Sequence, residues 1–314
     1  MKGINVLSLF DGMSCAMLAL EKLGIPVKNY YASEIDKFAI KVSKKNYPNI
    51  IQLGDVTNWR EWELPGIDLI IGGSPCQGFS NAGKRLNFDD PRSKLFFEFV
   101  DIVNHYNPKY FLLENVRMKE EHRQVITDYM KVEPIMINSA LVSAQNRVRY
   151  YWTNIPAVKQ PKDKGIILND IVEVDAIADR DKSFCITQNY WKGSNLDIYT
   201  KRKRNQIVFV KGAALRNQVT KRGIEAQMNI RKDSKSNCVV PSWAHKLNGC
   251  VEYDEDNKPK FRKLTPIECE RLQTVPDNYT DSVSNTQRYK MLGNGFTVDV
   301  IAHILSYGYY SLRD

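Results

Sequence analysis

The stretch INVLSLFDG, residues 4–12, is a short apolar run that ends in a tight turn. Residues 4–9 are typical of a buried strand, because their apolar side chains lack the spacing of an amphipathic helix. Apolar residues at helical spacing follow from Ala16 to Leu23, and Gly24 with Pro26 ends this helix. The stretch therefore predicts a strand, a turn and a helix in succession.

The same alternation continues through the first 155 residues. Apolar runs at 30–33, 67–71 and 110–113 are typical of strands, and apolar positions between residues 93 and 105 have helical spacing. Strands that alternate with helices in this way form a parallel sheet with helices on both faces. We therefore expect an α/β fold, built on a doubly wound and mostly parallel sheet.

Four side chains with useful chemistry lie where these strands end, namely Asp11, Glu34, Cys76 and Glu114. In sheets of this class the ligand binds outside the carboxyl ends of the strands. We therefore expect the four side chains to line one site. Each of them alone is equally compatible with a structural role, Glu114 as a carboxylate that caps the next turn.

A glycine turn after the first strand and an acid after the second form the usual layout for binding a nucleoside. The turn Phe10-Asp11-Gly12-Met13-Ser14-Cys15 has one glycine where a dinucleotide fingerprint has three, which argues against a pyrophosphate cradle. A cofactor with a nucleoside and no phosphates, such as S-adenosylmethionine, fits better. A plain turn between strand and helix would have the same pattern.

Cys76 lies in GGSPCQGFS, residues 72–80, between glycines and directly after a proline. A loop cysteine becomes a nucleophile only as a thiolate, which needs a polar and partly positive setting. Arg147 and Arg149 are candidates to provide that setting. Without such neighbours, the same cysteine would be an inert thiol. The six cysteines form no C-x-x-C pair and no cluster with zinc spacing, so we expect free thiols and no metal.

Basic residues are concentrated in one segment of the chain. The formal net charge is +9, and residues 200–235 contain 11 Lys/Arg and 2 Asp/Glu, which leaves 34 of each sign elsewhere. A confined basic excess is expected for a polyanion partner, although a solvated basic face would have the same composition. We see no signal peptide and no apolar run near the roughly 20 residues that span a bilayer. We therefore expect a soluble, intracellular protein without a membrane partner.

The chain changes character after about residue 155. Residues 155–260 are polar, basic and without a clear period, whereas Thr265-Pro266-Ile267-Glu268 is a capping box that begins a short helix. Gly293-Asn294-Gly295 predicts a turn before a last helical stretch at 297–305. We expect three parts: a catalytic and cofactor-binding domain at 1–155, a loop-rich domain at 156–280, and a C-terminal segment at 281–314 that returns to the first domain.

These segments resemble, in order along almost the whole chain, the motifs of DNA cytosine-5 methyltransferases of the bacterial or phage type. The motifs are Phe10-Asp11-Gly12, Glu34, Gly54-Asp55-Val56, Ser74-Pro75-Cys76-Gln77-Gly78-Phe79-Ser80, Glu114-Asn115-Val116, Gln145-x-Arg147-x-Arg149, Arg262-x-Leu264-Thr265 through Glu268-x-x-Arg271-Leu272-Gln273, and Gly293-Asn294-Gly295. Each is modest alone, but seven or more in the right order are very specific. Ser14 departs from the pattern, because many members have a second glycine there.

The resemblance implies methyl transfer from S-adenosylmethionine to C5 of a flipped-out cytosine, within a specific duplex DNA sequence, through a covalent Cys76–C6 intermediate. It implies catalytic roles for Cys76, Glu114, Arg147 and Arg149. It also implies cofactor-binding roles for Phe10, Asp11, Gly12, Glu34, Ile35, Asp55, Val56, Pro75, Asn294 and Gly295. The fold it implies is the Rossmann-like sheet of methyltransferases, with a smaller target recognition domain.

The basic segment lies where this family has its recognition domain. Candidate DNA contacts are Gln77, Ser80, Arg202, Arg204, Arg216, Arg222 and Arg231, although a phosphate contact or a solvated side chain would also explain each arginine of the basic segment. The resemblance implies a monomeric, cytoplasmic enzyme with double-stranded DNA as its partner, and leaves open a cognate restriction endonuclease. An RNA (tRNA) cytosine-5 methyltransferase on the same scaffold and a non-catalytic DNA-binding relative are the alternatives. The missing glycines argue against a nicotinamide oxidoreductase.

Overall fold

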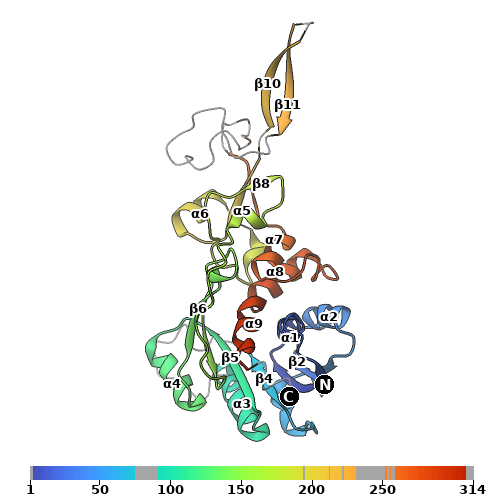
Figure 1. Cartoon of the computed structure of the whole chain (residues 1–314), viewed down its shortest axis with the longest axis vertical. Helices are drawn as coiled ribbons and strands as arrows, with labels where there is room; N and C mark the ends of the chain where they lie inside the picture. Colours follow the sequence, from blue (N-terminus) through green and yellow to red (C-terminus); the bar gives the residue numbers. More distant parts are fainter. Residues whose placement is uncertain are drawn as a thin grey trace.

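The computed structural model describes residues 3–74, 91–193, 195–211, 213–220, 223–230, 252, 255 and 259–308; for residues 91–93, 197, 213–220 and 223–230 it describes the backbone alone. A seven-stranded sheet with the strand order β3-β2-β1-β4-β5-β7-β6 is the centre of the molecule (Figure 1). Its strands are β1 (Ile4–Leu9), β2 (Val27–Ser33), β3 (Ile51–Gln52), β4 (Leu69–Gly72), β5 (Tyr110–Val116), β6 (Ile135–Asn138) and β7 (Val148–Thr153).

Strands β1 to β5 run parallel to one another, whereas β7 is antiparallel to both β5 and β6. The helices that belong to this sheet are α1 (Cys15–Lys22), α2 (Lys37–Asn46), η1 (Val56–Glu61), α3 (Pro91–Tyr106), α4 (Glu120–Met130), η2 (Ser139–Leu141) and α9 (Val298–Ser306). The predicted doubly wound, mostly parallel α/β fold is confirmed.

Neighbouring residues of each central strand enter two different hydrophobic cores, because successive side chains of a strand point to opposite faces. Val6 and Leu112 belong to the core that includes α1 and α9, whereas Leu7 and Leu113 belong to the core that includes α3 and α4. Helices therefore cover both faces of the sheet. The carboxyl ends of the strands remain the place where loops can form a site.

Two predicted boundaries were wrong. β5 does not end at Leu113 but continues to Val116, because β7 pairs with it there, with Val116 opposite Arg149. Glu114 is consequently held inside a strand. The predicted turn at residues 293–295 is instead the end of α8 (Asn285–Asn294), with Gly295 as the residue that follows the helix.

A smaller body, which we call the outer lobe, lies beyond the large sheet (Figure 1). Its three-stranded antiparallel sheet has the order β12-β9-β8. The lobe contains α5 (Leu168–Ile171), β8 (Ala176–Ile177), η3 (Tyr190–Lys192), α6 (Leu196–Arg202), β9 (Ile207–Val210), β12 (Phe261–Lys263), and a projecting hairpin of β10 (Ala213–Thr220) and β11 (Gly223–Ile230). Helices α7 (Pro266–Leu272) and α8 lie between the lobe and the large sheet (Figure 1).

The predicted capping box at the start of α7 is present. The Thr265 hydroxyl accepts a hydrogen bond from the Glu268 backbone N–H at 3.2 Å, and the Glu268 carboxylate accepts one from the Thr265 backbone N–H at 2.8 Å. Arg262 of β12 donates to the same carboxylate at 2.8 and 2.9 Å. The ion pair between Arg262 and Glu268 thereby links the start of α7 to the outer lobe. No helix within the described part of the chain is long and apolar enough to cross a membrane.

Candidate active site

The loop between β1 and α1 has an unusual backbone. Phe10, Gly12 and Ser14 all have left-handed conformations, with φ values of 56°, 60° and 65°. Such a conformation costs roughly 1–2 kcal/mol for a residue with a Cβ. The Ser14 hydroxyl lies 2.5 Å from Asp11 Oδ2 and 2.6 Å from the Ser43 hydroxyl, and these buried contacts hold the turn. The serine that departs from the family pattern therefore anchors the loop to α2.

Asp11 is buried beneath this loop and stabilises it, with 5% of its surface exposed. Its Oδ1 accepts a hydrogen bond from the Tyr30 hydroxyl at 2.7 Å, so both carboxyl oxygens have partners within the protein. Burial raises the pKa of Asp11 to about 6, against the opposing effect of hydrogen bonds from Ser14 and Tyr30. The side chain thus fixes the turn from inside and leaves the loop backbone to face a ligand.

Glu34 lies against the same turn from the end of β2. One carboxylate oxygen accepts from the Gly12 backbone N–H at 2.8 Å, and the other accepts from the N–H groups of Ile35 and Asp36 at 2.8 Å each. Ile35 exposes 74% of its surface, which is unusual for an apolar side chain. Glu34 offers a carboxylate that suits ribose hydroxyls, and Ile35 beside it offers an apolar surface that suits a base. This pair of neighbours fits the nucleoside of S-adenosylmethionine.

The other predicted cofactor residues near this turn have different surroundings. Phe10 is partly buried, and Val56 is buried at the start of η1. Asp55 caps η1, because its carboxylate accepts from the backbone N–H and the hydroxyl of Thr57 at 2.9 Å each. In this conformation the Asp55 side chain therefore has a local structural role.

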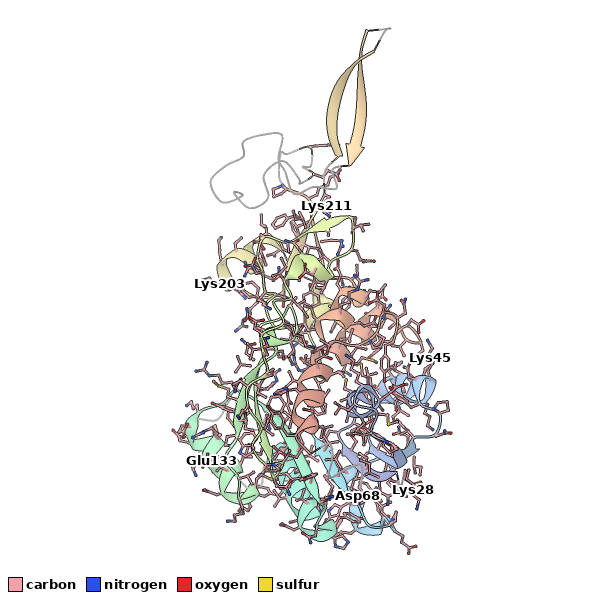
Figure 2. All side chains as sticks on the ribbon, viewed as in Figure 1. Lys28, Lys45, Asp68, Glu133, Lys203 and Lys211 are labelled. Atoms are coloured by element: carbon pink, nitrogen blue, oxygen red, sulfur yellow. The ribbon has the colours of Figure 1, made fainter. Side chains whose placement is uncertain are left out.

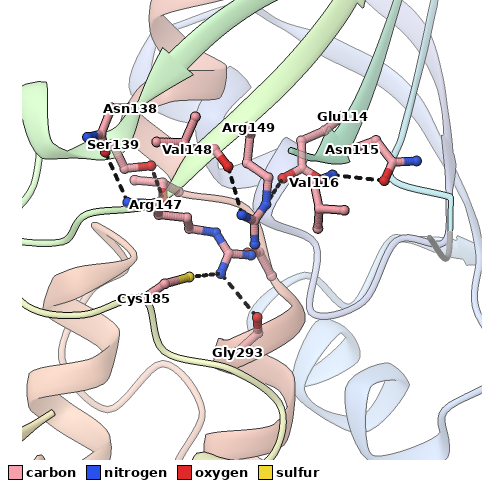
Figure 3. Close-up of polar contacts among 12 residues, drawn as sticks. Glu114, Asn115, Val116, Asn138, Ser139, Arg147, Val148, Arg149, Cys185 and Gly293 are labelled. Atoms are coloured by element: carbon pink, nitrogen blue, oxygen red, sulfur yellow. Dashed lines mark hydrogen bonds and ion pairs between the residues drawn. The ribbon is translucent and has the colours of Figure 1, made fainter. Parts of the chain in front are cut away.

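Glu114 and Arg149 form an ion pair across the neighbouring strands β5 and β7 (Figure 3). Arg149 Nε lies 2.9 Å from Glu114 Oε1, and 11% of the Glu114 side chain and 14% of the Arg149 side chain are exposed. Burial opposes the charge of Arg149, but the carboxylate of Glu114 raises the pKa of the guanidinium above its ordinary value. The structure therefore brings two predicted catalytic residues together as a charged pair.

The predicted nucleophile loop begins beside this pair. A Cβ placed on Gly73 would lie 3.3 Å from Glu114 Oε2, and the Asn115 amide donates to the Ser74 hydroxyl at 3.4 Å. Cys76 itself lies outside the described residues, as do Pro75, Gln77 and Ser80. The two residues that precede this segment, Gly73 and Ser74, adjoin the acid.

Arg147 has different surroundings from Arg149, although only one residue separates them. Its buried guanidinium donates to the carbonyl oxygens of Ile186 at 3.3 Å, Gly293 at 3.2 Å and Gly295 at 3.0 Å. Cys185 Sγ lies 3.5 Å from Arg147 Nη1 (Figure 3). Sequence reasoning did not single out Cys185, and no local pattern marks it, because its neighbours come from distant segments.

The family model described as "C-5 cytosine-specific DNA methylase" matches residues 4–307. The chain belongs to this family. Type II methyltransferase M1.ScrFI of Lactococcus lactis subsp. cremoris is 33% identical over 95% of this chain and 76% of its own length. Type II methyltransferase M.NlaX of Neisseria lactamica is 28% identical, over 96% and 94%. The solved structure of Entamoeba histolytica methyltransferase EhMeth has the same fold, with a TM-score of 0.67, 18% identity and full coverage of both chains.

As a member of this family, the methylase transfers methyl groups to C5 of cytosine in DNA by S-adenosylmethionine-dependent chemistry. Two predicted cofactor residues of the methylase lie at the end of α8. Asn294 is exposed, whereas Gly295 packs against the β1–α1 loop, since a Cβ on Gly295 would lie 3.1 Å from Met13 Cε. The end of α8 therefore packs against the predicted cofactor loop.

The predicted DNA contacts of the methylase are only partly described. Arg202 at the end of α6 and Arg204 just after it are exposed on the outer lobe. Arg216 lies in β10, opposite Gln227 of β11. Arg222 and Arg231 lie outside the described residues.

Proposed function

We propose that the methylase modifies cytosine within one specific duplex DNA sequence, with Cys76 as its nucleophile and S-adenosylmethionine as its methyl donor. The observation that carries this proposal is the Glu114–Arg149 ion pair, which adjoins the first residues of the Cys76 loop. The β1–α1 loop and Glu34, whose surroundings fit a nucleoside, are at the same edge of the sheet. A methyl donor and a target base would therefore meet at this edge.

The chemistry needs a nucleophile because C5 of cytosine is itself unreactive. The Cys76 thiolate adds to C6, and the electron pair released from the C5–C6 double bond makes C5 electron-rich. S-adenosylmethionine, held beside the β1–α1 loop and Glu34, would supply the methyl group to C5, and the S–CH3 bond that breaks would leave S-adenosylhomocysteine. A base removes the C5 proton, the Cys76–C6 bond breaks, and the double bond re-forms with the thiolate as the leaving group.

Glu114 and Arg149 act on the polar edge of the base. In its protonated form, the Glu114 carboxyl group donates a hydrogen bond to N3 and so stabilises the negative charge that develops on the base when C6 is attacked. Arg149 fixes one oxygen of this carboxylate at 2.9 Å and offers a positive charge to the same base. A cytosine can reach these groups only when it is flipped out of the duplex, at a cost of a few kcal/mol.

We assign DNA recognition to residues 156–280 and the catalytic and cofactor parts to residues 1–155 and 281–314. The basic excess at 200–235 supports this division, because phosphate contacts would help to offset the cost of base flipping. The relatives M1.ScrFI and M.NlaX are named Type II methyltransferases. A restriction endonuclease with the same target site, in a bacterial cell or a phage-infected host, is therefore the partner we propose for a monomeric, cytoplasmic enzyme.

The test has two steps. Methylome sequencing of cells that express the protein should find 5-methylcytosine at one sequence, and duplexes with that sequence should accept labelled methyl groups in preference to tRNA. Cys76→Ala should abolish transfer while S-adenosylmethionine affinity, measured by calorimetry, changes less than about twofold. Glu114→Gln should lower kcat by about 10²–10⁴. Transfer to tRNA alone would reassign the substrate, and residual turnover by Cys76→Ala would contradict the nucleophile.

A further inference from the structure

Arg147 lies where three segments that are distant in the sequence meet (Figure 3). We call residues 293–297 the α8–α9 junction. From the position just before β7, the Arg147 guanidinium reaches the carbonyl oxygen of Ile186, and on the junction it reaches the carbonyl oxygens of Gly293 and Gly295. Only 3% of Arg147 is exposed, so these bonds form away from solvent. One side chain thereby links the large sheet, the outer-lobe segment between β8 and η3, and the junction.

Two fully buried glutamines link the same segments. Gln145 accepts a hydrogen bond from the Ile186 backbone N–H at 2.8 Å. Gln273 donates to the Gly295 carbonyl oxygen at 3.3 Å and accepts from the Thr297 hydroxyl at 2.8 Å. The backbone N–H and the carbonyl oxygen of Ile186 therefore both form hydrogen bonds with buried side chains. The same is true of Gly293 and Thr297, the two ends of the junction.

The junction in turn contacts the parts that the reaction needs. A Cβ on Gly295 would lie 3.1 Å from Met13 of the β1–α1 loop. A Cβ on Gly73, where the nucleophile loop begins, would lie 3.0 Å from the Phe296 ring. The cofactor loop and the start of the Cys76 loop therefore pack on one short segment, and Arg147 connects that segment to the outer lobe.

We propose that Arg147 is a positioning residue that fixes the α8–α9 junction and the outer-lobe segment at Ile186 relative to β7, so that cofactor binding and DNA binding strengthen each other. The proposal rests on the proposed function, because it takes the outer lobe as the DNA-binding part. A shift of Ile186 relative to the junction would break an Arg147 hydrogen bond on one side or the other, and the junction packs against the cofactor loop. By linkage, each ligand then changes the affinity of the other by the same factor.

The guanidinium is suited to this position for a geometric reason. It presents several N–H donors in a rigid planar fork, and here Nη1 and Nη2 bond carbonyl oxygens of two separate segments. A lysine offers its donors from one nitrogen on a flexible stem. Arg147→Lys would therefore keep the positive charge but would not bond the carbonyl oxygens of both segments at once. Methionine would fill much of the volume and leave the carbonyl oxygens without this donor.

The probe is S-adenosylhomocysteine, whose dissociation constant is measured by calorimetry with and without a duplex that contains the methylated site. In the parent protein we expect the duplex to tighten binding at least fivefold. Arg147→Met and Arg147→Lys should reduce this factor to less than twofold. If Arg147→Met fails to fold, the Arg147→Lys variant carries the test.

Arg288→Met is the matched control, because Arg288 is also buried and pairs with Glu270 at 2.9 Å, away from Ile186. It should lower thermal stability and leave the coupling factor unchanged. A parent protein that binds both ligands independently, or an Arg147→Met variant with the parental factor, would overturn the inference alone. A parent that binds neither ligand would overturn the proposed function instead.

Discussion

Asp11 shows how one residue can link the β1–α1 loop to solution pH. Its pKa is raised from an ordinary 3.8 to about 6 because the fold buries the carboxyl and so disfavours its charged form. The folded protein therefore binds the Asp11 proton more tightly than the unfolded chain does. The free energy of unfolding consequently falls, through this residue, as pH rises from about 4 to 6.

We expect Asp11→Asn to remove this pH dependence, because asparagine carries no charge at any of these pH values. The difference between 6 and 3.8 corresponds to about 3 kcal/mol. Because the unfolded carboxyl is already about half ionised at pH 4, the unfolding free energy of the variant relative to the parent should rise by about 2 kcal/mol between pH 4 and pH 7. Urea denaturation at several pH values measures this change, and any constant effect on the Ser14 and Tyr30 hydrogen bonds cancels. Parallel pH profiles would contradict the prediction.

The sequence predicted some site residues and could not distinguish others. The acid at Glu114 and the glycine-flanked Cys76 are visible because their neighbours in the chain mark them. Arg147 and Arg149 look alike in the motif, yet one binds carbonyl oxygens and the other binds Glu114. Their difference depends on residues more than 30 positions away, which no local pattern can show.

At the level of helices and strands, Gly293 determines how closely α8 approaches the backbone of Thr187 and Gln188, between β8 and η3. A Cβ at this position would lie 2.2 Å from the Thr187 carbonyl carbon and 2.4 Å from the Gln188 nitrogen. These are backbone atoms, so the helix or the segment would have to move. A glycine that usually weakens a helix is here the only residue that permits the contact.

We expect Gly293→Ala to lower the free energy of unfolding by about 3 kcal/mol, because overpacking against the backbone outweighs the helix propensity of alanine. Gly66→Ala is the control, since a Cβ at Gly66 would meet no atom within 4 Å. The control should change stability by less than about 0.5 kcal/mol. Urea denaturation compares the two variants, and equal stabilities would show that the contact at Gly293 is not tight.

Local sequence was sufficient for elements whose own apolar pattern determines them, such as β1 at residues 4–9 and α7 with its capping box. It failed where a partner determines the element. β5 continues past Leu113 only because β7 pairs with it. Residues 293–294 remain helical because the Thr187–Gln188 backbone packs against a position without a side chain.

At the scale of the whole molecule, the basic residues of segment 200–235 that the structure describes lie on the outer lobe. Lys203 and Lys211 lie at the outer lobe, whereas Lys28 lies near the opposite end beside the large sheet (Figure 2). Residues 200–235 account for the whole excess of +9, since the rest of the chain has 34 charges of each sign. The described basic residues of this segment and the Glu114–Arg149 pair therefore belong to different parts of one elongated molecule (Figure 1).

This separation predicts which basic residues make DNA affinity sensitive to salt. Each phosphate contact adds about 0.9 to the slope of log affinity against log salt concentration, because binding releases counterions. Arg202→Gln and Arg204→Gln should each reduce the slope by about that amount, whereas Lys28→Gln, an exposed change on β2, should leave it unchanged. Fluorescence anisotropy of a labelled duplex between low and moderate salt measures these slopes. Equal slopes for all three variants would mean that DNA does not bind along this part of the outer lobe.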